Sequence, residues 1–129
     1  MSIRIVQLGS ARASDEGLRI GTVRRPPRGV PKEKYASENW YDSWLPQLAP
    51  SAELVKQALG ATSAKEWRAF TKKYRAEMST PDNARLLALL AALSRTTELS
   101  VGCYCEDEER CHRSVLRELL RENGAQLAE

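Results

Sequence analysis

Three cysteines and the only histidine of the chain fall within ten consecutive positions near its carboxyl end. The segment from residue 99 to residue 114 reads LSVGCYCEDEERCHRS, and the four residues are Cys103, Cys105, Cys111 and His112. Proteins use thiols and imidazoles as nucleophiles, proton carriers and ligands of soft metal ions. Arg113 follows directly, and its planar guanidinium suits a carboxylate or a phosphate. The sequence therefore predicts a functional site in this segment.

Zinc coordination is the first alternative for this cluster. Tetrahedral ligands at about 2.0 to 2.3 Å bring neighbouring sulfurs within about 4 Å of each other. On an extended strand, Cys103 and Cys105 are two rises of about 3.3 Å apart, and on a helix Cys111 and His112 point about 100° apart. A bend at Tyr104 would bring the sulfurs together, but the spacing matches no common structural zinc pattern. We therefore predict no metal ion and no other cofactor.

A cysteine loop of the phosphatase or rhodanese type is the second alternative. Such a loop needs an arginine six positions after its cysteine to bind the oxyanion. Those positions hold Glu109 after Cys103 and Cys111 after Cys105. The acidic run from Glu106 to Glu109 also repels a phosphate, whereas phosphate-binding loops are rich in glycine and backbone donors. The spacing argues against this class of site.

A thiol or acid–base site is the third alternative, and its candidate catalytic residues are Cys105, Glu106, Cys111, His112 and Arg113. We expect the N-terminus of a following helix to lower the pKa of the Cys111 thiol, and His112 to carry protons. In the structural alternative, the cysteines are small buried hydrophobic residues and His112 is a hydrogen-bonded core residue.

Basic residues gather in the first third of the chain. Residues 1 to 34 hold eight lysines and arginines against three acidic residues, in a chain whose formal net charge is +3. Prolines and a glycine in segment 24–31, RRPPRGVP, exclude a helix or strand and predict an exposed basic loop. We expect Arg24, Arg25 and Arg28 to bind the anionic group of a small molecule. A solvated basic face without a ligand is the structural alternative.

Nucleic-acid binding is the alternative function that these arginines suggest. They would contact phosphates, while Trp40, Tyr41 or Trp44 would stack on bases if exposed. The net charge is small, and no recognisable nucleic-acid-binding motif is present. We therefore expect a small enzyme or ligand-binding domain that acts on an anionic substrate. The alternative is a non-catalytic module that binds nucleic acid or a protein.

Apolar patterning predicts how these segments are positioned. We expect strands at 3–8, 18–23 and 99–105, and helical segments at 35–48, 51–59, 63–78, 80–93 and 111–123. In the helix that follows the capping-box sequence Ser63-Ala-Lys-Glu66, we expect Trp67, Phe70, Tyr74 and Met78 to lie in the core.

This order predicts a single α/β domain over residues 1–129, with a small, mainly parallel sheet of about three to four strands. The final strand should lie centrally and the C-terminal helix should pack on the sheet. Ligands of open α/β sheets collect at the carboxyl ends of the strands, so the cysteine segment and the basic loop should share that edge. We expect His112 on or beside the buried face of its helix and Arg113 nearer the solvent.

Composition limits where such a protein works. No stretch is apolar enough for a signal peptide or a membrane span, which predicts a cytoplasmic protein without a membrane partner. Three closely spaced cysteines are an odd number and do not make a disulfide framework, so we expect reduced thiols.

Two motifs resemble those of the bacterial YeaO-like proteins, a family with a domain of unknown function. One is Cys-Glu-(x)4-Cys-His-Arg, here Cys105 to Arg113, and the other is Pro-Arg-Gly, here Pro27 to Gly29. The likeness covers nearly the whole chain. Members tend to carry a tryptophan directly before the second motif, where this chain has Pro26. The resemblance implies the fold and the location of the site, and no established activity.

Overall fold

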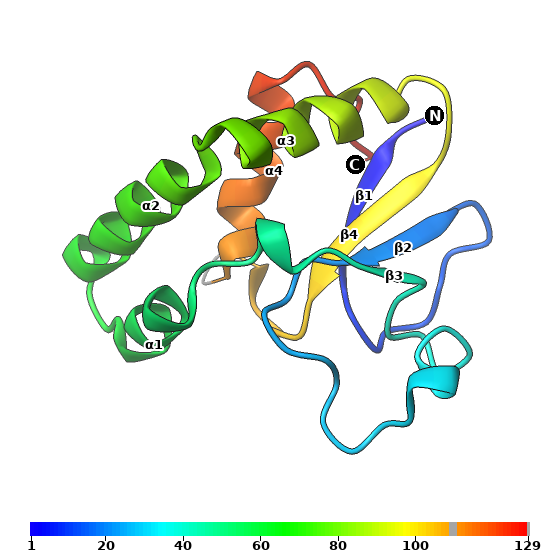
Figure 1. Ribbon diagram of the computed structural model, residues 1–129, viewed down its shortest axis with the longest axis horizontal. Coiled ribbons are helices and arrows are strands. Elements are labelled where there is room, and N and C mark those ends of the chain that lie inside the picture. The colour runs from blue at the N-terminus through cyan, green and yellow to red at the C-terminus, as the bar shows by residue number, and fades with distance from the viewer. Residues whose placement is uncertain (109–110, 129) are drawn as a thin grey trace.

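A four-stranded parallel sheet forms the centre of the computed structural model, which describes residues 1–108 and 111–128 (Figure 1). The strands are β1 (Ile3–Gln7), β2 (Leu18–Gly21), β3 (Ser43–Trp44) and β4 (Leu99–Cys103). Their order in the sheet is β1-β4-β2-β3, and all neighbouring pairs are parallel. The predicted α/β class, the mainly parallel sheet and the central position of the last strand are confirmed.

The α-helices group on one side of the sheet, and the carboxyl ends of the strands point towards α1 and the start of α4 (Figure 1). The α-helices are α1 (Ala52–Gly60), α2 (Ala64–Met78), α3 (Pro81–Leu93) and α4 (His112–Glu122). Two short 3₁₀ helices, η1 (Lys32–Lys34) and η2 (Pro46–Leu48), precede α1 in the chain. Ser63 caps α2 as predicted, because its hydroxyl accepts a hydrogen bond from the backbone N–H of Glu66 at 3.1 Å. No helix of the described residues is long and apolar enough to cross a membrane.

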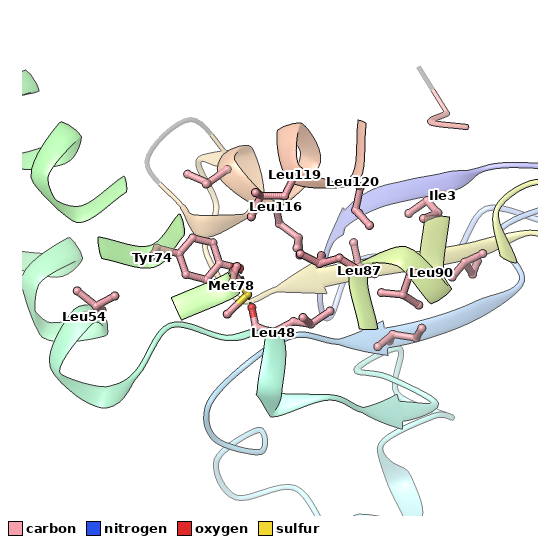
Figure 2. Close-up of a cluster of buried hydrophobic side chains, with 14 of the residues drawn as sticks. Ile3, Leu48, Leu54, Tyr74, Met78, Leu87, Leu90, Leu116, Leu119 and Leu120 are labelled. Atoms are coloured by element: carbon pink, nitrogen blue, oxygen red, sulfur yellow. Dashed lines mark hydrogen bonds between the residues drawn. The ribbon is translucent and has the colours of Figure 1, made fainter. Parts of the chain in front are cut away.

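The main core lies between these helices and one face of the sheet (Figure 2). Val101 of β4 and Leu116 and Leu120 of α4 are fully buried in it, so the C-terminal helix packs on the sheet as predicted. The predicted aromatic stripe of α2 also lies here, with Phe70, Tyr74 and Met78 buried and Trp67 partly buried. The Tyr74 hydroxyl donates to the Leu48 carbonyl oxygen at 2.6 Å, which joins α2 to the segment before α1.

The predicted helical segment at 35–48 is wrong. Asn39 adopts a left-handed backbone with φ of 65°, which ends any helix there, and residues 43–44 form β3 at the free edge of β2. The backbone N–H of Asp42 donates to the Arg19 carbonyl oxygen at 2.8 Å as this pairing begins. Tyr41 is buried in a second core cluster, and its ring leaves no room for a side chain at Gly21. Long-range pairing therefore overrides the local aromatic spacing.

A buried ion pair lies on the face of the sheet opposite the helices, where Ser100 points, because alternate residues of β4 face opposite sides. Arg19 is 0% exposed and Glu16 is 2% exposed. Two guanidinium nitrogens of Arg19 donate to the two carboxylate oxygens of Glu16 at 2.6 and 2.8 Å, and its third nitrogen donates to the carbonyl oxygens of Ser10 and Asn39. Arg19, one of the eight basic residues in the first 34 positions, is therefore part of the interior.

Candidate functional site

A cavity of about 500 Å³ opens at the carboxyl ends of β2 and β4, the edge where the sequence predicts the site. Its wall is mostly apolar, with three cationic side chains that the fold brings to it, Arg24 and Arg25 after β2 and Lys56 on α1. The cysteine segment and the basic loop contribute to the same cavity. The lining residues are Val23, Arg24, Arg25, Ala49, Pro50, Ala52, Val55, Lys56, Cys103, Tyr104, Cys105 and His112.

Two sulfurs and an imidazole nitrogen converge beside this cavity, to whose lining Cys103 and His112 belong. The ligand atoms of Cys103, Cys111 and His112 all lie within 4.8 Å of one another. The prediction that Cys111 and His112 point apart is therefore wrong, since the Cys111 sulfur lies 3.7 Å from Nδ1 of His112. The physical reason is that β4 ends at Cys103, and that Cys111 precedes α4 as its N-cap with extended backbone angles, so neither helix nor strand spacing applies.

The imidazole of His112 has one defined tautomer. Its Nε2 lies 2.7 Å from the Thr22 carbonyl oxygen, which can only accept a hydrogen bond, so Nε2 carries the proton. Its Nδ1 is then an acceptor and lies 3.7 Å from the Cys111 sulfur. Burial lowers the pKa of His112 to about 4, against the opposing hydrogen bond to Thr22, so the ring is neutral near neutral pH.

Cys105 is the exposed thiol of the cluster, whereas Cys103 and Cys111 are buried. Hydrogen bonds donated by Cys103 and by Cys111 hold the pKa of the Cys105 thiol well below its usual range, although burial opposes them. The predicted lowering of the Cys111 pKa is wrong. A hydrogen bond with Cys103 lowers the pKa of Cys111, but the donation to Cys105 and burial outweigh it and raise the pKa. The thiol that ionises most readily is therefore Cys105.

Arg113 is buried, and the prediction that it lies nearer the solvent is wrong. It is 3% exposed, and its Nη2 donates to the Cys105 carbonyl oxygen at 2.6 Å. Burial lowers the pKa of Arg113, but electrostatic interaction with Cys103 and hydrogen bonding to Cys111 outweigh burial and raise the pKa, so the guanidinium stays charged. The Arg113 guanidinium is therefore buried because the cysteine sulfurs and the Cys105 carbonyl oxygen interact with it. Its hydrogen bond also fixes the backbone at Cys105.

The three predicted anion-binding arginines have different surroundings. Arg24 donates to the carbonyl oxygens of Pro50 and Ala49 at 3.1 and 3.0 Å, which holds the segment before α1 at the rim of the cavity. Arg25 is exposed and lines the cavity that contains Cys105. Arg28 instead lines a neighbouring hollow of about 540 Å³, so it does not share the space with Cys105.

The acidic run contributes little to the cavity. Glu106 is exposed and is not among the described residues that line the cavity. Glu108 accepts hydrogen bonds from Arg117 at 2.8 and 3.0 Å, and these bonds hold the pKa of Glu108 below its usual range. Glu109 lies outside the described residues.

Two residues that the sequence reasoning missed complete the site. Lys56 lies on an exposed position of α1, and nothing in the local sequence distinguishes it from other surface lysines. Thr22 is fully buried, and its backbone N–H and its hydroxyl both donate to the Gly102 carbonyl oxygen at 3.0 Å. This attachment to β4 fixes the carbonyl group that orients His112, a contact between residues that are far apart in the sequence.

Comparison with known proteins gives one match. A family model described as "Active DUF488-N3 subclade" matches residues 3–124, which is nearly the whole chain. No curated protein and no solved structure matches the chain.

Proposed function

We propose that this chain, which belongs to the DUF488-N3 family, is an enzyme that binds a small anionic substrate in the cavity and attacks it with the Cys105 sulfur. The family match supports a domain of unknown function, as the resemblance implies, and it does not test the two motifs. The matched family model is described as active, which favours a chemical role for the cavity over a purely structural one.

One observation carries the proposal: an exposed thiol shares a mostly apolar cavity with three cationic side chains. Arg24 donates to backbone carbonyl oxygens at the rim, so the proposal relies on Arg25 and Lys56. A volume of about 500 Å³ is within the range of small-molecule sites. Cations in a cleft with apolar walls attract anions more strongly than they do on an open surface. The substrate class that fits is therefore a small molecule with an anionic group, an apolar part and an electrophilic atom.

The chemistry is that of a covalent thiol intermediate. The Cys105 sulfur attacks an acyl carbon of the substrate and forms a thioester, while the leaving group departs with the electron pair of the bond that breaks and takes up the thiol proton. Water then hydrolyses the thioester: its hydroxyl bonds to the acyl carbon, and its remaining proton restores the thiol. Arg113 acts as a positioning residue, because its Nη2 holds the Cys105 carbonyl oxygen. Cys111, His112 and Glu106 are not needed as nucleophiles in this scheme.

The experiment compares two alkylating reagents that differ mainly in charge, the anion iodoacetate and the neutral iodoacetamide. Mass spectrometry follows their rates at Cys105 in the wild type and in Arg25→Ala, Lys56→Ala and the double variant. Each cation contributes about 1 kcal/mol to a neighbouring monoanion in water, or about fivefold in rate. We expect the ratio of the iodoacetate rate to the iodoacetamide rate to fall by up to that factor for each substitution.

Two controls make the comparison specific. Lys72→Ala removes an exposed lysine that does not line the cavity, and it should leave the ratio unchanged. Added salt should lower the wild-type ratio towards that of the double variant, because ions screen the attraction. An equal ratio in the wild type and the double variant would refute the proposed anion binding.

The alternative function is a module that binds nucleic acid. The first third of the chain offers less unpaired positive charge for it than the sequence indicates. Arg4 pairs with Asp15 at 3.1 Å, and Arg12 pairs with Asp42 at 2.8 Å. Arg19 is buried in its own ion pair. Three of the eight basic residues in the first third are thus already neutralised by carboxylates, which favours a small anion at Arg25 over a long phosphate backbone.

A further inference from the structure

The sulfurs of Cys103 and Cys111 and an imidazole nitrogen of His112 have nearly the spacing of metal ligands. Zinc bonds of about 2.3 Å to sulfur and about 2.0 Å to nitrogen place two tetrahedral sulfurs about 3.8 Å apart, and a sulfur about 3.5 Å from a nitrogen. The Cys111 sulfur lies 3.7 Å from Nδ1 of His112, and the whole set with Cys103 lies within 4.8 Å. Shifts of about 1 Å or less would complete the coordination. Thiolate and imidazole ligands favour zinc over magnesium or calcium.

His112 is prepared for coordination by its second nitrogen. Its Nε2–H donates to the Thr22 carbonyl oxygen at 2.7 Å, so the lone pair of Nδ1 faces the sulfurs. A histidine that binds a metal almost always donates its other ring N–H to a carbonyl or carboxylate, which fixes the ring. Because Thr22 is itself fully buried and bonded to Gly102, the ring orientation does not depend on a mobile partner.

Cys111 also has a supporting hydrogen bond. It is the N-cap of α4, and its sulfur accepts from the backbone N–H of Arg113 at 3.5 Å. Backbone donors and the positive end of a helix favour negative charge on such a sulfur. This hydrogen bond favours the thiolate that a metal ion requires, against the burial and the donation to Cys105 that raise the pKa of Cys111 in the metal-free chain.

We propose that Cys103, Cys111 and His112 bind one zinc ion, with its fourth coordination position open to the cavity. Cys103 and His112 both line the cavity, so the ion would lie in its wall. Cys105 does not belong to the group of three and remains the exposed thiol, although it loses the hydrogen bonds from Cys103 and Cys111 when those two thiols bind zinc. Three protein ligands with an open position are the arrangement of catalytic rather than structural zinc. A contact between that position and the substrate rests on the proposed function, whereas zinc binding itself does not.

Zinc binding at this site has a fixed proton balance. The thiols of Cys103 and Cys111 each lose a proton, while Nδ1 of His112 coordinates through its existing lone pair. Binding one zinc ion to the neutral groups therefore releases two protons. Two thiolates and a neutral imidazole balance the charge of the ion.

The test uses the full chain, purified under reducing conditions, stripped with a chelator and then titrated with Zn²⁺ or Co²⁺. We expect one metal ion per chain and, with Co²⁺, the absorption bands of tetrahedral thiolate coordination. Calorimetry in buffers of different ionisation enthalpy should show a net release of protons, two from the ligands less any proton that Cys105 takes up when it loses its donors. A wild-type chain that does not retain one zinc ion would overturn the proposal, whatever the variants do.

Four variants test the ligand set. Cys103→Ser, Cys111→Ser and His112→Gln should each weaken zinc binding at least about tenfold, because even changes beyond the ligands cost about 10- to 100-fold. Cys105→Ser should bind zinc as the wild type does, and circular dichroism checks that each variant folds. If Cys105→Ser lost zinc as the other variants do, the open position would be refuted.

Failure of the zinc site is distinguishable from failure of the proposed function. The preference of Cys105 for iodoacetate depends on Arg25 and Lys56 and is measured on the metal-free chain. Zinc content depends on Cys103, Cys111 and His112 and needs no substrate.

Discussion

Replacing Arg19 with methionine tests whether the buried ion pair holds the far face of the sheet. The change keeps most of the side-chain length but removes the donors to Glu16, Ser10 and Asn39. Glu16 is only 2% exposed. Without Arg19, its carboxylate keeps the hydrogen bonds from the Ser100 hydroxyl and the Ala13 N–H but has no cation beside it. Breaking a buried pair in this way costs about 3 to 5 kcal/mol. A domain of this size has about 5 to 15 kcal/mol of stability in all.

Urea denaturation followed by circular dichroism measures this loss in the free energy of unfolding. Arg4→Met is the matched control, because it breaks an ion pair with Asp15, whose side chain is 71% exposed. Pairs of that kind contribute about 0 to 1 kcal/mol. The double variant Glu16→Leu/Arg19→Met removes both charges and should be more stable than Arg19→Met alone.

The pH dependence of the free energy of unfolding is a second, independent test of the ion pair. In the wild type burial raises the pKa of Glu16, but hydrogen bonds from Arg19 and Ser100 and the charge of Arg19 together hold it below its ordinary value of 4.5. The wild type therefore gains stability from Glu16 above that value and loses it as the pH falls further. Without Arg19, burial dominates and the carboxyl group prefers its proton. The stability gap between wild type and Arg19→Met should narrow as the pH falls from neutral towards 4.5. A gap no larger than that of Arg4→Met, or one that widens in acid, would refute the reasoning.

Three further measurements test other parts of the structure. Gly21→Ala should destabilise the fold by about 1 to 3 kcal/mol, because its Cβ would overlap the Tyr41 ring, whereas Gly60→Ala meets open space and should be neutral or stabilising in thermal melting. Ser63→Ala should cost about 1 kcal/mol in urea denaturation, because the hydrogen bond to the Glu66 N–H is lost, and no loss would mean that the cap does not contribute. Labelled single-stranded and duplex oligonucleotides should stay free at low salt with micromolar protein, and binding that weakens steeply with salt would instead support the nucleic-acid function.

The elements with strong local signals could be predicted from the sequence. Ser63 before α2 and Pro81 at the start of α3 satisfy the backbone at helix ends, where the favourable residue types are few. The apolar face of α4 predicted how this helix packs, because only that side of the helix can be buried, whereas β4 is buried on both of its faces. The shared carboxyl edge of parallel strands then predicted where the cysteine segment and Arg25 meet.

The features that sequence reasoning missed depend on partners far away in the chain. Segment 35–48 pairs with β2 because that strand offers a free edge, which no local pattern reports. Arg19 is buried because Ser10, Asn39 and Glu16 surround its guanidinium. The approach of Cys103 and Cys111 depends on where β4 ends and α4 begins, and a shift of one residue in either boundary would separate them.

Thr22 anchors the backbone between the imidazole of His112 and the basic loop. Its carbonyl group holds the imidazole, and three residues further along the same backbone Arg25 lines the cavity. Because the backbone N–H and the hydroxyl of Thr22 both donate to the Gly102 carbonyl oxygen, a displacement at Arg25 stops at this anchor. The loop beyond Thr22 can therefore change in length or sequence without turning the ring.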